Sequence, residues 1–351
     1  MKIGKKRICI YSMIVVFVLT IFYNIWLSII LLALYLILIS VYCLYLILNK
    51  LIKGTVWWNN QFTYTKQFVS NDGYRKDLHR NYEVVNVGSN PARFAFFYED
   101  VLGENWSTGT QGLDMDLEIL KYYHSYLKDG AYVLLPIVPF SSVSGYLVKS
   151  PISYYAKFVR ILDSLQIRNN THMQQARKYI KMPLRYNWRN VRHLIKDSKP
   201  DNRLNIVEQP LQLMEMEQSA IKIMNSWKDE FDIKEWRGEL PAHLLKGREK
   251  SIQMMSSMIS FLLERGYKPV LISPPMSHPL TKLFTPQIKE NYIYSFVDEI
   301  KKLYDIPYLD YTEVEEFQEE VLYFNALFMN LKGRKLFTKR VLLDLGISSA
   351  S

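Results

Sequence analysis

Two residues of this sequence, a serine and a histidine, have side chains that could perform acyl-transfer chemistry. Ser89 lies in the stretch Gly88-Ser89-Asn90-Pro91, and His278 follows Pro274 and Pro275. A serine hydroxyl becomes a nucleophile when an imidazole accepts its proton, and a carboxylate usually orients that imidazole. The sequence offers no evident acid partner, so a capping or turn serine and a loop histidine remain the alternative interpretation.

Other groups for acid–base or metal chemistry are scattered. Asp114 and Asp116 are two residues apart and do not share a helix face, so we expect them at the surface or as helix caps. The six histidines stand isolated, without the spacing of a metal site. The sequence therefore predicts no metal and no other cofactor.

The stretch around Ser89 indicates a strand, a tight turn and a helix. Val84, Val85 and Val87 favour a strand, Gly88 permits backbone angles closed to other residues, and Pro91 suits a first helical turn. In an open parallel sheet, such a turn lies at the carboxyl ends of the strands, where ligands and catalytic side chains collect. We expect the functional site at this turn.

The same alternation of strand and helix recurs along the chain. Helices are predicted at 93–102, 113–123, 252–263, 293–303 and 330–342, and further strands at 106–109, 131–138, 269–273 and 307–310. This pattern predicts an α/β fold, a flavodoxin-like, three-layer, doubly wound parallel sheet of four or five strands. The domain is expected to cover residues 81–351, with a helical insertion at about 141–245.

The first 54 residues predict a membrane segment. Residues 8–49 carry no charge, and as helix they would span roughly twice a hydrocarbon core of about 30 Å. Two transmembrane helices, near 8–25 and 27–48, fit this length, with Trp57 and Trp58 as interfacial anchors and residues 55–80 as a linker. The predicted location is the cell membrane, as a multi-pass protein in contact with the lipid bilayer.

The side of the membrane that the large domain faces is less well specified. Lysine and arginine flank both ends of the apolar run, so the positive-inside rule keeps both ends in the cytoplasm. A single long tilted span is the alternative and would place the domain outside. Cys9 and Cys43 both lie in the apolar run, so no disulfide indicates the domain's compartment.

The net charge of +10 does not indicate nucleic-acid binding. The first 53 residues carry six positive charges and no negative ones, which leaves +4 for the rest of the chain. A surplus this dilute has no basic stripe to follow a phosphate backbone, so no nucleic acid is expected as a partner. The basic patch at 185–193 is interpreted as a solvated face or as side chains near an anionic bilayer, with an anionic polymer as the alternative ligand.

Several short segments together resemble the SGNH/GDSL hydrolase superfamily, within it the membrane-anchored branch linked to bacterial cell-surface polysaccharides. The resemblance covers about residues 82–140 and 246–345 and rests on the order and spacing of the segments. They are residues 86–90, 109–120, 135–140, 272–275, 309–311 and 325–333. In that family the nucleophile turn comes first, and an Asp-x-x-His pair precedes the last helix.

The resemblance implies the fold without the hydrolase reaction. The family's chemistry uses a serine nucleophile, a histidine base, an acid and oxyanion donors. On this chain the serine position falls on Asn90, with Ser89 one residue early, the acid position on Asn325 and the base position on Phe328. Phenylalanine cannot accept a proton, and asparagine cannot stabilise an imidazolium as a carboxylate does.

Two functions therefore remain open. The first is a non-catalytic SGNH hydrolase-like protein, a pseudoenzyme that binds a glycan or a membrane-bound biosynthesis partner in surface-polysaccharide assembly. The second is an acyl ester hydrolase or O-acyltransferase on a surface polysaccharide, with a rearranged site of Ser89 and His278. The expected binding residues are Gly88, Ser89, Asn90, Gly109, Gln111, Asn325 and Phe328. We expect Asn90, Asn325 and Phe328 to converge, because their loops gather at one edge of the sheet.

Overall fold

The computed structural model describes residues 5–23, 25–62, 80–109, 111–147, 152–196, 209–236 and 239–347. The chain divides into two compact units. The helical unit comprises Met1–Asn59 and Lys178–Lys199, and the α/β unit comprises Asn60–Arg177 and Pro200–Ser351. The expected insertion at 141–245 is thus shared between the two units.

The α/β unit is built on a sheet of five strands, all parallel, in the order β2-β1-β3-β4-β5. The strands are β1 (Tyr82–Asn86), β2 (Gly103–Asn105), β3 (Leu127–Pro136), β4 (Lys268–Ser273) and β5 (Tyr308–Asp310). Val84, Val133 and Leu271 are fully buried, as expected for a sheet covered by other elements. The prediction of an α/β fold with a parallel sheet is confirmed.

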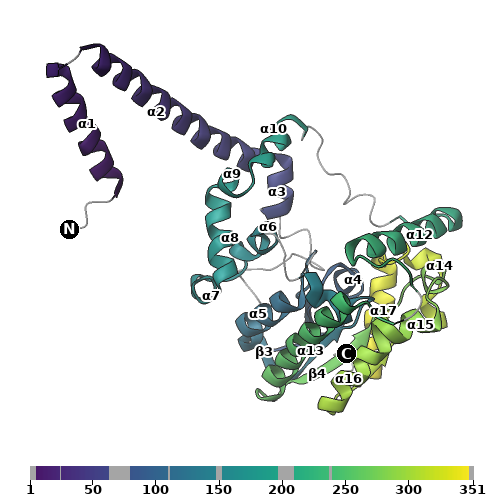
Figure 1. Cartoon of the computed structure of the whole chain (residues 1–351). Helices are drawn as coiled ribbons and strands as arrows, with labels where there is room; N and C mark the ends of the chain where they lie inside the picture. The colour runs from purple at the N-terminus through teal and green to yellow at the C-terminus, as the bar shows by residue number, and fades with distance from the viewer. Residues whose placement is uncertain are drawn as a thin grey trace. The chain divides into compact units, whose positions relative to one another are not determined.

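Long helices lie between these strands and after the last one (Figure 1). They are α5 (Leu113–Tyr123), α13 (Ala242–Leu263), α16 (Ser295–Leu303) and α17 (Leu331–Asp344). Each overlaps a predicted helix, although α13 begins ten residues before the predicted start at 252, and α13 contacts both α5 and α16. Short helices α14 (His278–Thr281) and α15 (Pro286–Lys289), the π-helix η6 (Glu290–Tyr294) and the 3-10 helices η2 (His124–Tyr126), η7 (Glu315–Phe317) and η8 (Glu320–Leu322) fill the remaining connections.

The prediction of a helix at 93–102 is wrong. Only α4 (Asn90–Arg93) forms, and turns follow it. The Asn105 side chain explains the early end, because its Nδ2 donates to the carbonyl oxygens of Ala92, Arg93 and Phe96 at 3.4, 3.3 and 3.1 Å. The Ala92 carbonyl also accepts the Ala95 and Phe96 N–H groups, while the carbonyls of Arg93 and Phe96 would accept N–H groups if the helix continued. The strand predicted at 106–109 is also displaced, since β2 ends at Asn105.

The described part of the insertion is helical, as predicted. Its α-helices are α6 (Ile152–Ala156), α7 (Ser164–Asn169), α8 (Thr171–Lys181), α9 (Pro183–Tyr186), α10 (His193–Lys196) and α12 (Leu213–Glu230). Its 3-10 helices are η3 (Ser141–Leu147), η4 (Lys157–Arg160) and η5 (Trp188–Arg192). The α/β unit receives η3, α6, η4, α7 and α12, whereas α9, η5 and α10 belong to the helical unit.

The helical unit starts with two apolar helices, α1 (Lys5–Tyr23) and α2 (Ile25–Gly54), whose bounds lie close to those predicted, 8–25 and 27–48. By length and composition, α2 could cross a membrane, while the apolar stretch of α1, Ile10–Thr20, is shorter than a span. The structure thus supports one of the two expected spans. In the expected linker, Val56–Phe62 forms helix α3, and residues 63–79 lie outside the described residues.

Candidate functional site

The turn after β1 has the geometry that its sequence predicts. Gly88 adopts a φ of +121°, which side chains rarely permit, and an added Cβ would lie 2.9 Å from the Cβ of Ala92. The Gly88 N–H donates to Asp116 Oδ1 at 2.9 Å. The first turn of α4 therefore begins from a backbone that a buried carboxyl group holds in place.

Asp116 is buried, and the expectation of a surface or capping residue is wrong. Its side chain accepts from Gly88 N and from Gln111 Nε2, the latter at 2.6 Å, and Gln111 also donates to Trp106 O at 3.0 Å. Burial raises the pKa of Asp116 to about 7, against the two hydrogen bonds that lower it, and Asp114 adds to the rise. The spacing of apolar residues in α5 did not predict that Asp116 is buried, because the hydrogen-bond partners of Asp116 come from loops outside the helix.

Two tyrosines of the insertion extend this polar cluster. The Tyr155 hydroxyl donates to Asp114 Oδ2 at 2.8 Å, and the Gly112 N–H donates to the Tyr154 hydroxyl oxygen. Burial, reinforced by the charge of Asp114, raises the pKa of Tyr154, so this hydroxyl keeps its proton at neutral pH. The start of α5 is thereby joined to α6.

A cleft of about 910 Å³ opens at the carboxyl ends of β1 and β3. Of the predicted binding residues it is lined by Gly88, Ser89, Asn90, Gln111 and Phe328. The sequence did not single out its other walls, which the insertion and α13 supply. These include Tyr154, Tyr155, Trp227, Glu230, Phe231, His243, Lys246 and Lys250. The richness of the insertion in Tyr and Trp was the one available signal, and it did not specify which residues face the cleft.

Aromatic rings form one wall of the cleft. Phe140 follows β3 with a φ of +73°, and its buried ring lies 4.9 Å from Trp227 and 5.1 Å from Phe231, centroid to centroid. Tyr292 contacts the same ring at 4.7 Å. Phe140 anchors this cluster, while Trp227 keeps part of its surface exposed toward solvent. Ser89, Asp114 and Asp116 also line the cleft and bring hydroxyl and carboxyl groups to it.

The two candidate catalytic residues occupy different places. Ser89 lines the cleft, and its hydroxyl does not cap α4. His278 is exposed at the start of α14 and is not among the residues that line the cleft. No hydrogen bond joins these two side chains, both of which lie in the described part of the chain. The histidine that does line the cleft is His243, whose Nε2 lies 3.0 Å from Phe231 O.

The positions taken from the family resemblance are only partly brought together. Asn90 and Phe328 both line the cleft, and the Phe328 ring lies 5.1 Å from that of Phe94. Asn325 Oδ1 accepts the backbone N–H groups of Leu327 and Phe328 at 2.9 and 2.8 Å, so it shapes its own loop instead of facing the cleft. Gly109 lies against the Asn90 carboxamide, since a Cβ there would be 3.0 Å from Asn90 Oδ1.

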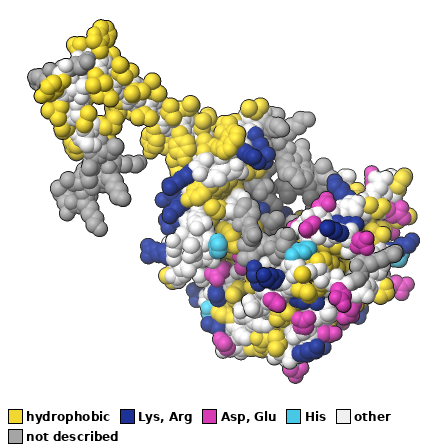
Figure 2. Space-filling model, viewed as in Figure 1, with side chains coloured by type: hydrophobic (Ala, Val, Ile, Leu, Met, Phe, Trp, Pro, Cys, Tyr) yellow, Lys and Arg dark blue, Asp and Glu magenta, His cyan; other side chains and the backbone are white. Residues whose placement is uncertain are grey.

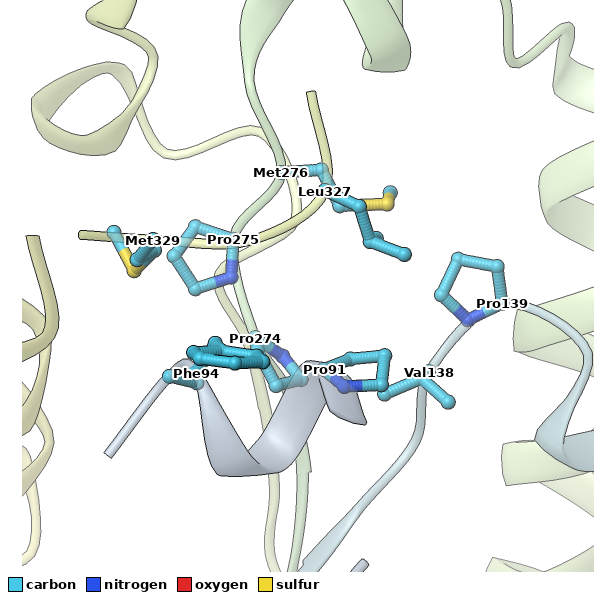
Figure 3. Close-up of a pocket in the computed structure, with 10 residues that line it drawn as sticks. Pro91, Phe94, Val138, Pro139, Pro274, Pro275, Met276, Leu327 and Met329 are labelled. Atoms are coloured by element: carbon cyan, nitrogen blue, oxygen red, sulfur yellow. The ribbon is translucent and has the colours of Figure 1, made fainter. Parts of the chain in front are cut away.

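Beside the cleft, the loops after β1, β3 and β4 meet the loop before α17 in an apolar crevice. Figure 3 shows Pro91 and Phe94 facing the Pro274–Pro275 turn and Leu327, with Val138 and Pro139 at one end. Its volume of about 10 Å³ holds roughly one water molecule. None of the residues that line it has a titratable side chain, so this junction offers no group for proton transfer.

Neither a comparison with models of known protein families nor a comparison with curated proteins found a match for this chain. The site's chemistry must therefore be argued from its own geometry. Among the described residues, no group of three His, Cys, Asp or Glu side chains is placed to hold a metal ion. What the cleft presents is an aromatic wall, a polar floor and charges of both signs.

The stability of the chain should depend on pH through Asp116. Its pKa of about 7 in the folded chain exceeds its ordinary 3.8, so the folded state keeps a proton that the unfolded state releases. Stability is then full at low pH and is lost as pH rises toward about 7. Asp116→Asn stays neutral and removes this loss. We expect the melting temperature of the wild type, relative to Asp116→Asn, to fall between about pH 4 and about pH 7 and to level off above that.

The exposed residue Asp305 provides the control. Asp305→Asn should follow the wild-type pH dependence, measured by thermal unfolding of the full chain in detergent micelles. A constant difference between wild type and Asp116→Asn across this range would show that Asp116 is ionised throughout.

Proposed function

We propose that this chain is a membrane-anchored, non-catalytic protein with an SGNH hydrolase-like α/β unit, which binds a surface glycan in its cleft. The proposal includes a flavodoxin-like wrapping of helices on both faces of the sheet. The strand order β2-β1-β3-β4-β5 supports that wrapping, which a crystal structure of the chain can check. The bacterial cell-surface polysaccharide context comes from the sequence resemblance alone.

The lining of the cleft is the observation that carries the glycan proposal. Its volume of about 910 Å³ lies at the upper end of the range for ligand sites, about 300–1,000 Å³. A sugar ring has an apolar face of C–H groups and a rim of hydroxyls. Trp227 offers a ring for the apolar face, while Asn90 and Asp114 offer acceptors for hydroxyls.

The lack of a placed base supports a binding role over acyl transfer. Phe328 occupies the position that the resemblance assigns to the histidine, and it packs against Phe94. His278 does not line the cleft with Ser89. A serine without a base within hydrogen-bond reach is a weak nucleophile at neutral pH.

Binding can be tested with the full chain in lipid nanodiscs on an array of oligosaccharides from bacterial surface polymers. Trp227→Ala removes the aromatic surface and Asn90→Ala removes a polar group of the floor. Each should weaken binding by about tenfold or more, roughly 1.4 kcal/mol. Leu303→Ala and Asn225→Ala change exposed residues outside the cleft and should leave binding unchanged. Binding that is equally strong in all four variants would mean that the glycan contacts another surface.

Hydrolysis of acyl esters separates the two functional classes. We expect the full chain to hydrolyse p-nitrophenyl acetate no faster than its Ser89→Ala variant, because no base activates the hydroxyl. The comparison with Ser89→Ala is essential, since binding and oxyanion contacts alone can accelerate hydrolysis. A rate that disappears in Ser89→Ala would establish the enzyme and rule out the non-catalytic proposal.

The membrane topology is the remaining part of the proposal. We propose that α1 crosses the bilayer together with α2, so the chain is multi-pass and the α/β unit is on the same side as the N-terminus, which the flanking lysines make the cytoplasm. A periplasmic-type alkaline phosphatase fused after Lys53 should then be inactive. Phosphatase activity in that fusion, with an inactive fusion at the N-terminus, would instead demonstrate a single span.

A further inference from the structure

A short basic segment, residues 178–196, is folded onto the end of helix α2 within the helical unit. We call it the basic segment. Asn49 makes the first connection, because its Oδ1 accepts the Leu184 N–H at 3.0 Å while its Nδ2 donates to Tyr45 O at 2.7 Å. Lys53 Nζ donates to Lys181 O at 2.7 Å. Asn49 is 2% exposed, so this attachment is built into the fold of the unit.

Aromatic contacts make a second connection. The Trp57 ring stacks on His193 with centroids 3.9 Å apart and planes 2° from parallel. Trp58 is buried and lies 5.9 Å from Tyr179, whose hydroxyl accepts from Asn190 Nδ2 at 3.0 Å. The prediction that Trp58 anchors in the bilayer interface is therefore wrong, since its side chain packs inside the unit. These contacts hold the basic segment in one orientation on α2 and α3.

Residues 1–59 and 178–196 include no acidic residue, although the chain has 34, and Asp197 is the single acid of the helical unit. The basic segment itself carries Lys178, Lys181, Arg185, Arg189, Arg192 and Lys196. The side chains of Arg185, Arg189 and Arg192 are exposed. Their positive charge is therefore not neutralised from within these residues, and it adds to that of Lys50 and Lys53 at the end of α2.

Two large apolar side chains are exposed among these cations. Trp188 is 74% exposed and Ile195 is 82% exposed. A solvated polar face gives no reason for such exposure, whereas the bilayer interface accommodates tryptophan, isoleucine and arginine together. Exposed apolar side chains among cations therefore indicate a surface that faces a membrane. A surface that binds a soluble anionic polymer through charge alone would not need them.

The length of α2 places the basic segment at the level of the lipid headgroups. Its 30 residues extend about 45 Å, which exceeds a hydrocarbon core of about 30 Å by about ten residues. If the span begins near Ile25, the last ten residues of α2 reach the headgroup region, and Asn49 and Lys53 are among them. Figure 2 shows the hydrophobic surface of this helix giving way to Lys and Arg side chains.

We propose that the basic segment, with Lys50 and Lys53, is a binding surface for the headgroups of anionic phospholipids in the bilayer that α2 enters. Arginine guanidinium groups donate paired hydrogen bonds to lipid phosphates, and Trp188 and Ile195 enter the interface between headgroups and acyl chains. The surface would fix the depth and rotation of α2 at the end nearest the α/β domain in sequence. This inference concerns the helical unit and does not depend on the ligand of the cleft.

The test uses the full chain in nanodiscs of phosphatidylcholine alone or of phosphatidylcholine mixed with phosphatidylglycerol. Amide hydrogen exchange over residues 183–196 is measured in both. Each basic residue near an anionic surface favours binding by about fivefold, so exchange should be at least about tenfold slower with phosphatidylglycerol. High salt should reduce the difference by screening. The triple variant Arg185→Gln, Arg189→Gln, Arg192→Gln should abolish it.

A matched variant removes the same charge elsewhere. Lys222→Gln, Lys234→Gln and Lys301→Gln change exposed residues of the α/β unit and should keep the full effect. Trp188→Ser with Ile195→Ser should speed exchange in both lipids while the preference for phosphatidylglycerol persists. Unchanged exchange over residues 213–230 shows in each case that the chain is folded.

Three outcomes would overturn the proposal. Equal exchange in the two lipids would make the basic segment a solvated face. Protection in phosphatidylcholine nanodiscs by a soluble polyanion such as heparin, but not by phosphatidylglycerol, would make it a polymer site. Protection by inorganic phosphate alone would show a site for free phosphate and not for a bilayer.

Discussion

The buried carboxamide of Asn86, at the carboxyl end of β1, connects the elements on which the cleft is built. Its Nδ2 donates to Asn105 Oδ1 at 2.8 Å and to Ser107 Oγ at 2.7 Å, and its Oδ1 accepts from the Tyr98 hydroxyl at 3.0 Å. Leaving one such buried partner unsatisfied costs about 1–3 kcal/mol. The Asn105 Nδ2 in turn donates to the carbonyls of Ala92 and Arg93 in α4 and of Phe96 just after it. The ends of β1, β2 and α4 are therefore interdependent, and so is the turn that carries Ser89.

The same sheet edge supports two different environments. Where the loops after β1, β3 and β4 meet the loop before α17, prolines, Phe94 and Leu327 form an apolar crevice without a titratable side chain. Toward α5 and the insertion, hydrogen-bonding groups come from Asp116, Asp114 and Tyr155. Burial raises the pKa of Asp116 to about 7. The polar groups that line the cleft are thus contributed by the turn after β1, by α5 and its preceding loop, by the insertion and by α13, and not by the apolar crevice.

The two units differ in how they handle charge. The helical unit has thirteen Lys and Arg residues and one acidic residue, Asp197. The α/β unit instead pairs many of its cations, as in Lys128 with Glu83 at 2.6 Å and Arg340 with Asp344 at 3.0 Å. Exposed pairs of this kind contribute little to stability, but they keep the net field of the α/β unit small. The long-range attraction of the protein for anions therefore comes from the helical unit, next to the helix that is apolar enough to cross a membrane.

Periodicity and local residue chemistry were enough to predict the parallel sheet, its long helices and the turn at Gly88, because each depends on residues close together in the sequence. The same is true of α2, which an uncharged apolar run defines. The end of α4 was not predictable, since it is decided by Asn105, a residue of the next strand. Burial of Asp116 depends on Gly88 and Gln111 in the same way. Only the tertiary structure decided that Trp227 and Tyr155 face the cleft, that Asn325 does not, and that residues 178–196 fold onto α2 and not onto the sheet. Such contacts join residues far apart in the chain, and their free energy depends on desolvation and geometry that no local pattern contains.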